Sequence, residues 1–142
     1  MYWSDIMEKY MEIAIKLAKK AAKKGEIPVG AVIVKNGKII SKAYNKKETK
    51  NDCTKHAEII AIQKASKKIK NWRLIDCEIY ITMEPCMMCS GAIKQSRIKK
   101  IVYGTKNKNY GYTECLKNIE IIPFVCENEC RKMVQSFFKK KR

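Results

Sequence analysis

The chain has a single histidine, only 14 acidic residues among 142 and no long apolar run free of charge. A transmembrane helix needs about 20 nearly uncharged residues, and lysines interrupt each apolar run before that length. Asp5 and Glu8 stand near the start, where a secretory signal would carry a continuous apolar stretch. No repeat, linker or low-complexity segment is present. We therefore expect one domain over residues 1–142, in the cytoplasm and with no membrane partner.

The basic charge has two explanations. The 31 Lys and Arg exceed the 14 Asp and Glu by 17, a surplus that suits the phosphates of a nucleic acid. Only four of the 31 are arginine, and isoleucine and asparagine are abundant too. A genome rich in A and T would encode the same mixture without any anionic partner. The charge alone therefore leaves both explanations open.

Seven cysteines in a chain without an export signal predict reduced thiols, with metal binding or catalysis as the special roles. Cys86 and Cys89 stand out because they form the one Cys-x-x-Cys motif of the chain. Four others lie apart among apolar neighbours, and we expect them to pack as small hydrophobic side chains: Cys77, Cys115, Cys126 and Cys130.

Periodicity and turn residues predict helices and strands along the whole chain. Apolar residues at three- and four-residue steps indicate a first helix from Ile6 to Ala21, which ends near Gly25. Asn36-Gly37 lies between apolar runs at 29–34 and 39–44 and indicates a hairpin with a type I′ turn. The other expected elements are a helix over 55–70 capped by Asp52 or Thr54, strands at 79–83 and 101–103, a short helix from Cys86, a loop over 105–113, a strand at 119–125 weakened by Pro123, and a helix over 127–140.

The strand–helix–strand unit over residues 79–103 implies a parallel pair of strands with a right-handed crossover. The pattern as a whole is typical of an α/β fold. We expect a three-layer α/β/α sandwich, in which helices cover both faces of a central mixed sheet of about five strands.

His56 and the motif Cys86-x-x-Cys89 each stand where a helix is expected to begin. Near a helix N-terminus the helix dipole lowers the pKa of a thiol, and the thiolate is the form that binds metal. Pro85 loses no helical hydrogen bond just before the second of these helices. Three ligands are typical of a catalytic zinc site, whereas structural sites normally have four. These residues therefore predict an open Zn²⁺ site, with one ion per subunit.

Glu58 stands two residues after His56. From there a carboxylate can reach a water molecule at the open position of the site without being a metal ligand. It can take a proton from water and pass it to a leaving group, as a general acid–base does. His-x-Glu followed by Pro-Cys-x-x-Cys is the signature of zinc-dependent nucleobase deaminases. A thioredoxin-like redox site would instead place its Cys-x-x-Cys after the first strand and lack the upstream His-x-Glu.

Longer segments extend this similarity. EIPVGAVIVKNGKII, HAEIIAI and YITMEPCMMCSGAIKQSRIKKIVYG resemble the cytidine deaminase superfamily and, more narrowly, the bacterial tRNA-specific adenosine deaminases. The resemblance runs from near Tyr2 to QSFFKK at the end of the chain. It implies the cytidine deaminase-like fold and a homodimer whose two subunits both line the RNA groove. It also implies hydrolysis of adenosine to inosine at the wobble position of a tRNA anticodon loop, with a zinc-activated water and Glu58 as proton shuttle.

Carried over by position, the resemblance implies substrate contacts as well. Asn45 is expected to hydrogen-bond the target nucleotide, Val29 to line the base pocket and the Ala57 backbone to contact the purine edge. Val29 also fits a core position, and Asn45 also fits a turn at the end of a strand. Four further residues are expected to contact the RNA: Pro85, Lys106, Asn107 and Phe137. Phe137 and Phe138 are both candidates for stacking on a base, although helical spacing places one of them in the core.

Two departures from the family's pattern concern the substrate. The segment between Leu116 and Cys130 is shorter than is usual, and Asn107 stands where members commonly carry an aspartate. Neither change affects the zinc chemistry, but both lie where an RNA backbone is distinguished from a DNA backbone. Because a carboxylate facing the strand is missing, we hypothesise that the chain tolerates single-stranded DNA better than an aspartate-bearing relative.

Two other functions fit the same motif. A zinc deaminase of free nucleobases or nucleosides, of the guanine or cytosine type, shares the catalytic residues but needs no basic face. Its activity responds little to salt, whereas an enzyme of tRNA loses affinity steeply as salt rises. A non-catalytic zinc module that only binds RNA needs no proton shuttle, and Glu58 argues against it.

Overall fold

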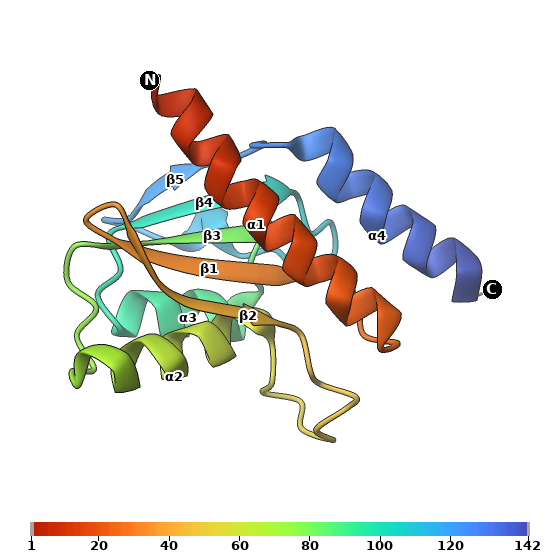
Figure 1. Ribbon diagram of the computed structural model, residues 1–142, viewed down its shortest axis with the longest axis horizontal. Helices are drawn as coiled ribbons and strands as arrows, with labels where there is room; N and C mark the ends of the chain where they lie inside the picture. Colours follow the sequence, from red (N-terminus) through yellow and green to blue (C-terminus); the bar gives the residue numbers. More distant parts are fainter. Residues whose placement is uncertain (1, 142) are drawn as a thin grey trace.

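A computed structural model describes residues 2–141, which form a mixed five-stranded sheet between two pairs of helices (Figure 1). Helices α1 and α4 cover one face of the sheet, and α2 and α3 cover the other. The expected three-layer α/β/α sandwich is therefore confirmed. In chain order the elements are α1 (Trp3–Lys23), β1 (Gly30–Lys35), β2 (Lys38–Tyr44), α2 (Ala57–Ile69), β3 (Cys77–Met83), α3 (Met87–Gln95), β4 (Lys100–Thr105), the 3-10 turn η1 (Thr113–Cys115), β5 (Glu120–Ile122) and α4 (Glu127–Lys141).

The strand order is β2-β1-β3-β4-β5. Strand β1 pairs antiparallel with β2 and β3, whereas β3, β4 and β5 run parallel. At the β1–β2 turn Asn36 and Gly37 have φ values of 48° and 78°, the positive values that a type I′ turn requires. Strand β5 stops at Ile122 because Pro123 has no N–H to donate to a ladder. The hairpin and the parallel β3–β4 pair are as predicted.

Two hydrophobic cores fill the spaces on either side of the sheet. Val32 and Tyr80 face α1 and α4, while the neighbouring Ile33 and Ile79 face α2 and α3. Successive side chains of a strand point to opposite faces, so each central strand contributes to both cores. Because both faces are covered, these strands are almost continuously apolar and show no polar alternation.

The predicted cap of the second helix is wrong. Helix α2 begins after His56, and no side chain caps its first turn. Asp52 instead accepts hydrogen bonds from the backbone N–H and the hydroxyl of Thr54, at 2.9 and 2.7 Å. This local Asx turn satisfies Asp52 inside the loop, so the side chain is not available to the helix.

The prediction for the four separate cysteines is only partly confirmed. Cys77 and Cys130 are fully buried, but Cys115 is exposed and Cys126 is half-buried. Cys115 ends the short turn η1, in which Thr113 is the buried residue. One turn of 3-10 helix directs its successive side chains in different directions, and the sequence alone does not indicate which of them faces inward.

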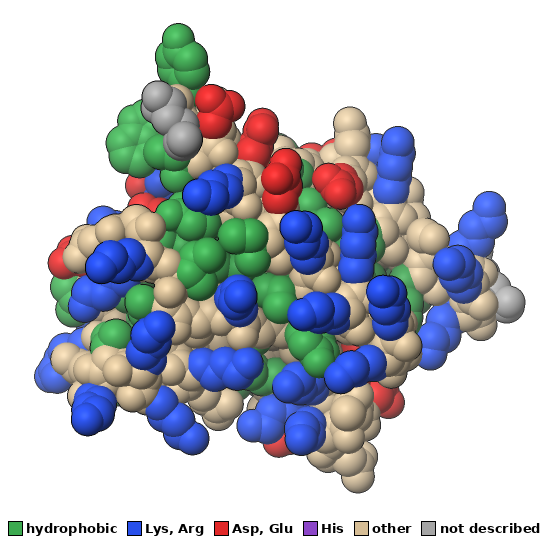
Figure 2. Space-filling model, viewed as in Figure 1, with side chains coloured by type: hydrophobic (Ala, Val, Ile, Leu, Met, Phe, Trp, Pro, Cys, Tyr) green, Lys and Arg blue, Asp and Glu red, His purple; other side chains and the backbone are tan. Residues whose placement is uncertain are grey.

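Lysine and arginine side chains spread over the face on which α1 lies and form no single patch there (Figure 2). On this face, therefore, charge does not mark out one binding surface. Within residues 2–141 no helix has the length and apolar character needed to cross a bilayer.

Gly30 lies directly beneath α1. A Cβ added to Gly30 would lie 2.0 Å from the carbonyl oxygen of Ala14 and 2.9 Å from the amide nitrogen of Ala18. Both are backbone atoms of α1, so the helix would have to move away from the sheet. We expect Gly30→Ala to lower the free energy of unfolding by about 3 kcal/mol in urea denaturation.

Gly91→Ala is the matched control for Gly30→Ala. Gly91 lies in α3, and an added Cβ there would meet nothing within 4 Å. This substitution should raise the free energy of unfolding by up to about 1 kcal/mol, because alanine favours a helix. Equal stabilities of the two variants would contradict the close contact between Gly30 and α1.

Candidate active site

Helices α2 and α3 lie side by side and begin at the same edge of the sheet (Figure 1). His56 is the N-cap residue of α2, and Cys86 is the N-cap residue of α3. Strand β3 ends at Met83, so the chain leaves the sheet only three residues before Cys86. The two helix N-termini, each carrying partial positive charge, thus meet beside the candidate ligands.

The three candidate metal ligands form one cluster. Nδ1 of His56 lies 3.8 Å from Sγ of Cys86 and 3.5 Å from Sγ of Cys89. All three ligand atoms lie within 4.8 Å of one another. A nitrogen and a sulfur bound to one tetrahedral zinc lie about 3.6 Å apart, given the usual Zn–N and Zn–S bond lengths. The donor set and its spacing therefore fit Zn²⁺.

The two thiols differ in their readiness to ionise. Hydrogen bonds with Cys89 and His56 together lower the pKa of Cys86 to about 4, against the opposing effect of burial. Donating its hydrogen bond to Cys86, together with burial, raises the pKa of Cys89. Cys86 is thus a thiolate at neutral pH, and a bound cation would remove the proton from the second thiol.

Glu58 lies in the first turn of α2 and is buried. Burial raises the pKa of its carboxyl group to about 7. A carboxyl group with such a pKa can both accept and donate a proton near neutral pH, which is what a general acid–base requires. The side chain lines the same cavity, of about 370 Å³, as His56 and Cys86.

Three of the predicted substrate contacts line this cavity, which we call the catalytic pocket: Val29, Asn45 and Ala57. Asn107 lines it too, from the loop that follows β4. The remaining lining residues were not predicted: Ile27, Lys47, Met83, Glu84 and Tyr110. They come from four separate segments that only the folded chain brings together.

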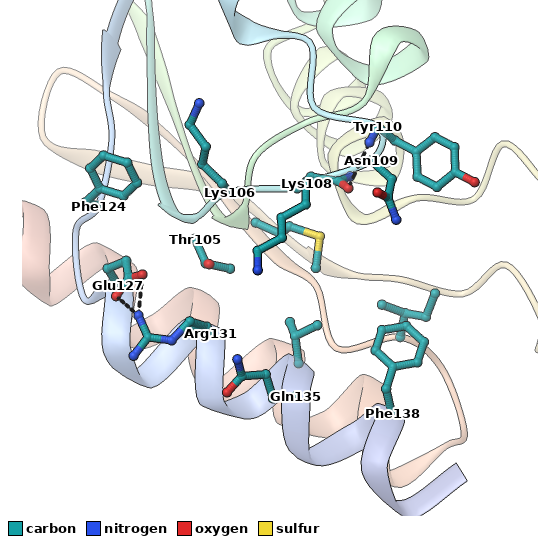
Figure 3. A pocket seen from close by; sticks show the side chains of 14 residues that line it. Thr105, Lys106, Lys108, Asn109, Tyr110, Phe124, Glu127, Arg131, Gln135 and Phe138 are labelled. Atoms are coloured by element: carbon teal, nitrogen blue, oxygen red, sulfur yellow. Dashed lines mark hydrogen bonds and ion pairs between the residues drawn. The ribbon is translucent and has the colours of Figure 1, made fainter. Parts of the chain in front are cut away.

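A larger cavity of about 610 Å³ adjoins the catalytic pocket and lies between the β4–η1 loop and α4 (Figure 3). Lys108 points from the loop toward α4, where Arg131 forms an ion pair with Glu127 at 2.6 Å. Both cavities are lined by the same four residues at their junction: Ile27, Met83, Asn107 and Tyr110. The pocket therefore opens into a groove with space for more than one base.

Three predicted contacts lie outside the catalytic pocket. Pro85 is buried, and its carbonyl oxygen accepts a hydrogen bond from the amide of Tyr112 at 3.1 Å. Lys106 lines the adjoining groove, but its ammonium group is 2.9 Å from a carboxylate oxygen of Glu114. Phe137 lines the cleft between α1 and α4, and it also lines a smaller cavity beside Asn45 and Lys47. Phe138, its neighbour in an edge-to-face pair, lines this smaller cavity and the adjoining groove.

Glu84 is a functional candidate that the sequence did not reveal. This buried carboxylate accepts hydrogen bonds from the amides of Asn107, at 3.3 Å, and Thr113, at 3.2 Å, and from the Thr113 hydroxyl. It thereby holds the β4–η1 loop against the pocket. A Cβ on Gly111 would lie 2.3 Å from Glu84, so this close approach also requires glycine. An acidic residue directly before Pro85 was the only available signal.

Comparison with known proteins agrees with this geometry. Residues 4–105 match the family model described as the cytidine and deoxycytidylate deaminase zinc-binding region. The tRNA-specific adenosine deaminase of Buchnera aphidicola is 43% identical over 94% of both chains. A solved structure from studies of A-to-I editing by tRNA:A34 deaminases at the wobble position has a TM-score of 0.83 and 31% identity, over 88% of this chain and 98% of that one. The guanine deaminase of Bacillus subtilis has a TM-score of 0.68 and 42% identity, over 72% of this chain and 66% of that one.

Proposed function

The chain belongs to the cytidine and deoxycytidylate deaminase zinc-binding family, and we propose that residues 1–142 act as one domain that hydrolyses adenosine to inosine at the wobble position of a tRNA anticodon. One observation carries this conclusion. His56, Cys86 and Cys89 converge beside the buried Glu58 in one pocket, in a chain whose similarity to tRNA-specific adenosine deaminases extends over 94% of its length. Hydrolysis at C6 of adenine releases ammonia.

His56 and the sulfurs of Cys86 and Cys89 would hold the zinc, one ion per subunit. When bound, zinc polarises water and lowers its pKa, so that a nucleophile forms at neutral pH. The converging N-termini of α2 and α3 stabilise the two thiolates. Cys89 is fully buried, which keeps bulk water from this side of the site.

Glu58 moves the proton. Its carboxylate first accepts a proton from the attacking water and then donates it to the amino group that leaves C6. Both steps require a pKa close to the working pH, and the buried environment of Glu58 raises its pKa to about 7. Its place in the first turn of α2 holds the carboxylate beside the ligands while leaving it free of the metal.

The pocket positions the base. Val29 and Ile27 form an apolar wall, and Asn45 lies beside them with its side-chain amide 3.3 Å from the carbonyl of Ile27. The backbone of Ala57, at the start of α2, is available to the edge of the purine. A base in an anticodon loop is unpaired, so it can be turned into such a pocket at low cost, whereas a duplex would first have to open.

The alternative is deamination of a free base, which the similarity to a guanine deaminase favours. The catalytic pocket, at about 370 Å³, accommodates one base. The adjoining groove of about 610 Å³ exceeds what a free base needs. It carries Lys106, Lys108, Arg131 and the half-exposed ring of Phe138, which suit the phosphates and bases of a strand. This groove favours a polynucleotide substrate.

The proposal predicts that metal binding and proton transfer can be separated. Glu58→Ala should retain one zinc per chain but lose at least about a hundredfold in inosine formation on a tRNA with a wobble adenosine. Cys86→Ser should lose both the zinc and the activity, because one ligand is gone. Metal content is measured by inductively coupled plasma mass spectrometry, and inosine by mass spectrometry of the digested tRNA.

Cys115→Ser is the control for this pair, because Cys115 is exposed and lies outside the catalytic pocket. It should retain both zinc and activity. A wild-type protein that binds zinc yet deaminates no tRNA would contradict the proposed function.

We also propose that Asn107 makes the enzyme tolerant of single-stranded DNA. Asn107 lines the junction of pocket and groove, and its side-chain oxygen accepts a hydrogen bond from the amide of Tyr110 at 3.2 Å. Aspartate can accept the same hydrogen bond, so Asn107→Asp changes the charge and preserves the loop. On matched RNA and DNA hairpins, we expect this substitution to raise the RNA-to-DNA rate ratio several-fold.

Asn109→Asp is the matched control for Asn107→Asp. It adds the same charge two residues away, on a side chain that lines the groove but not the catalytic pocket. It should change the RNA-to-DNA ratio much less. An unchanged ratio in Asn107→Asp would exclude the proposed role of Asn107.

The enzyme is further proposed to be a cytoplasmic homodimer in which both subunits line the RNA groove. Met87 and Met88 begin α3 beside the ligands, and both are exposed, as is Tyr110 at the pocket. Exposed apolar side chains of this kind are typical of subunit interfaces. Sedimentation equilibrium should give twice the 16.5 kDa mass of the chain; a monomer at micromolar concentration would contradict the dimer.

A further inference from the structure

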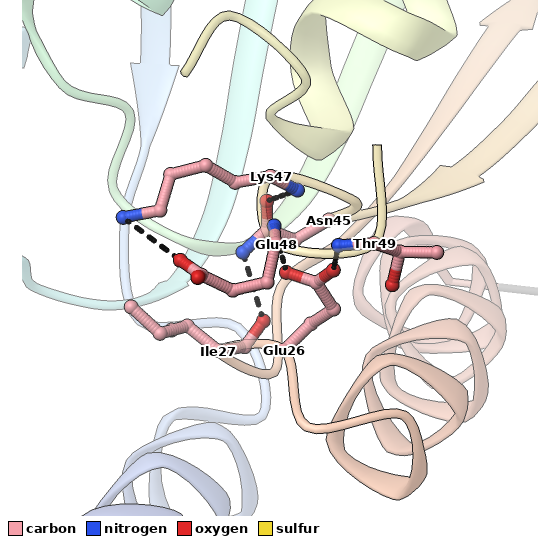
Figure 4. Close-up of polar contacts among 6 residues, drawn as sticks. All are labelled: Glu26, Ile27, Asn45, Lys47, Glu48 and Thr49. Atoms are coloured by element: carbon pink, nitrogen blue, oxygen red, sulfur yellow. Dashed lines mark hydrogen bonds and ion pairs between the residues drawn. The ribbon is translucent and has the colours of Figure 1, made fainter. Parts of the chain in front are cut away.

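Glu26 is a buried acidic residue that the catalytic mechanism does not use. It follows Gly25 at the end of α1, and its side chain is 0% exposed. One carboxylate oxygen accepts a hydrogen bond from the amide of Glu48 at 3.0 Å, and the other from the amide of Thr49 at 2.5 Å (Figure 4). Both donors belong to the loop between β2 and α2, which lies far from Glu26 in the sequence.

This loop forms part of the catalytic pocket. It contributes Asn45 and Lys47, and it ends at His56, the N-cap residue of α2. The amide of Asn45 donates to the carbonyl of Val29 at 3.1 Å, and its side chain donates to the carbonyl of Ile27 at 3.3 Å. Segments 26–29 and 45–49 are therefore one hydrogen-bonded wall of the pocket, and Glu26 anchors this wall at Glu48 and Thr49 (Figure 4).

The Glu26 side chain that anchors this wall is a charged carboxylate. Burial by itself would raise the pKa of Glu26, but hydrogen bonds from Thr49 and from the Glu48 amide, together with the charge of Lys47, hold the pKa below its usual value. The ionised carboxylate therefore accepts both hydrogen bonds. Charge-assisted hydrogen bonds of this kind are about twice as strong as neutral ones. The loop tip at Glu48 and Thr49 is itself exposed, so these hydrogen bonds, and not side-chain packing, hold it in place.

We propose that Glu26 is a positioning residue for the deamination, which holds Asn45 and Lys47 at the place where they meet the target nucleotide. This inference rests on the proposed function of the pocket. Glu26 does not touch the substrate; it acts through the β2–α2 loop. Removing its charge lets the loop move, which weakens substrate binding. The chemical step is unaffected, because α2 and α3 hold the ligands and Glu58.

Glu26→Gln tests the proposal with little change of shape. One oxygen becomes an NH2 group, which cannot accept a hydrogen bond from a backbone amide. We expect KM for tRNA to rise about tenfold, kcat to change by less than about twofold, and one zinc per chain to remain. Glu26→Asp, which keeps the charge on a side chain shorter by one methylene, should give a smaller rise in KM. It also serves as the test if Glu26→Gln does not fold.

A double-mutant cycle separates positioning from a general loss of stability. If Glu26 acts through Asn45, the double variant Glu26→Gln/Asn45→Ala should bind tRNA little worse than Asn45→Ala alone. Glu84→Gln is the matched control, since Glu84 is a buried carboxylate that holds the other loop of the pocket, between β4 and η1. The fold increases in KM caused by Glu84→Gln and by Asn45→Ala should multiply in their double variant. The proposal would be overturned if the increases caused by Glu26→Gln and Asn45→Ala also multiplied, or if KM were unchanged in both Glu26 variants.

Amide hydrogen exchange gives a readout that needs no activity. Glu26→Gln should speed exchange at Glu48 and Thr49 at least tenfold, and Glu84→Gln should speed exchange at Asn107 and Thr113 instead. Unaltered exchange at Glu48 and Thr49 would overturn the role of Glu26 even if the enzyme is active. Failure of the wild-type protein to deaminate tRNA would contradict the proposed function, and the exchange result would still decide whether Glu26 holds the loop.

Discussion

The N-termini of α2 and α3 lie next to each other at one edge of the sheet, and the zinc site exists because of that contact. His56 and Cys86 are the N-cap residues of the two helices, so their positions are set by where each helix begins. Strand β3 in the middle of the sheet leads directly into α3, and the shared core beneath α2 and α3 fixes their separation. Two helix dipoles then place partial positive charge around two thiolates and one carboxylate. Ligand geometry, the ionisation of Cys86 and the place of Glu58 all follow from this one packing arrangement.

The substrate side of the pocket is built on a different principle. Its walls are loops, which carry little core of their own, and each wall is held by a buried carboxylate that accepts backbone hydrogen bonds. Glu26 holds the β2–α2 loop, and Glu84 holds the β4–η1 loop. Because the carboxylates accept from backbone amides, the loop side chains remain free to face a ligand. The candidate catalytic group is thus rigid because helices carry it, while residues of the pocket walls, such as Asn45 and Asn107, depend on a few hydrogen bonds.

Much of the fold and the catalytic group could be predicted from local patterns. Helical and strand periodicity, the Asn36-Gly37 turn and the motif around Cys86 are all short-range features, and the structure confirms the elements they predict. The cap prediction for the second helix was wrong because Asp52 is bound by Thr54 within its own loop. Local patterns also did not show which side chains meet other parts of the chain. Spacing on α4 did not distinguish Phe137 from Phe138, although only Phe138 lines the groove. Nor did it show that Glu114 pairs with the ammonium group of Lys106.

The sequence by itself determined the chemistry: a histidine, two cysteines and a glutamate at the starts of two expected helices, within an α/β pattern. These features are local, so they can be read without coordinates. Only the tertiary structure decided what surrounds that chemistry, including the shape of the pocket, the groove beside it and the buried carboxylates that hold its walls. Glu26 and Glu48 are 22 residues apart, and nothing in a linear pattern marks a charge as buried until the fold supplies its partners.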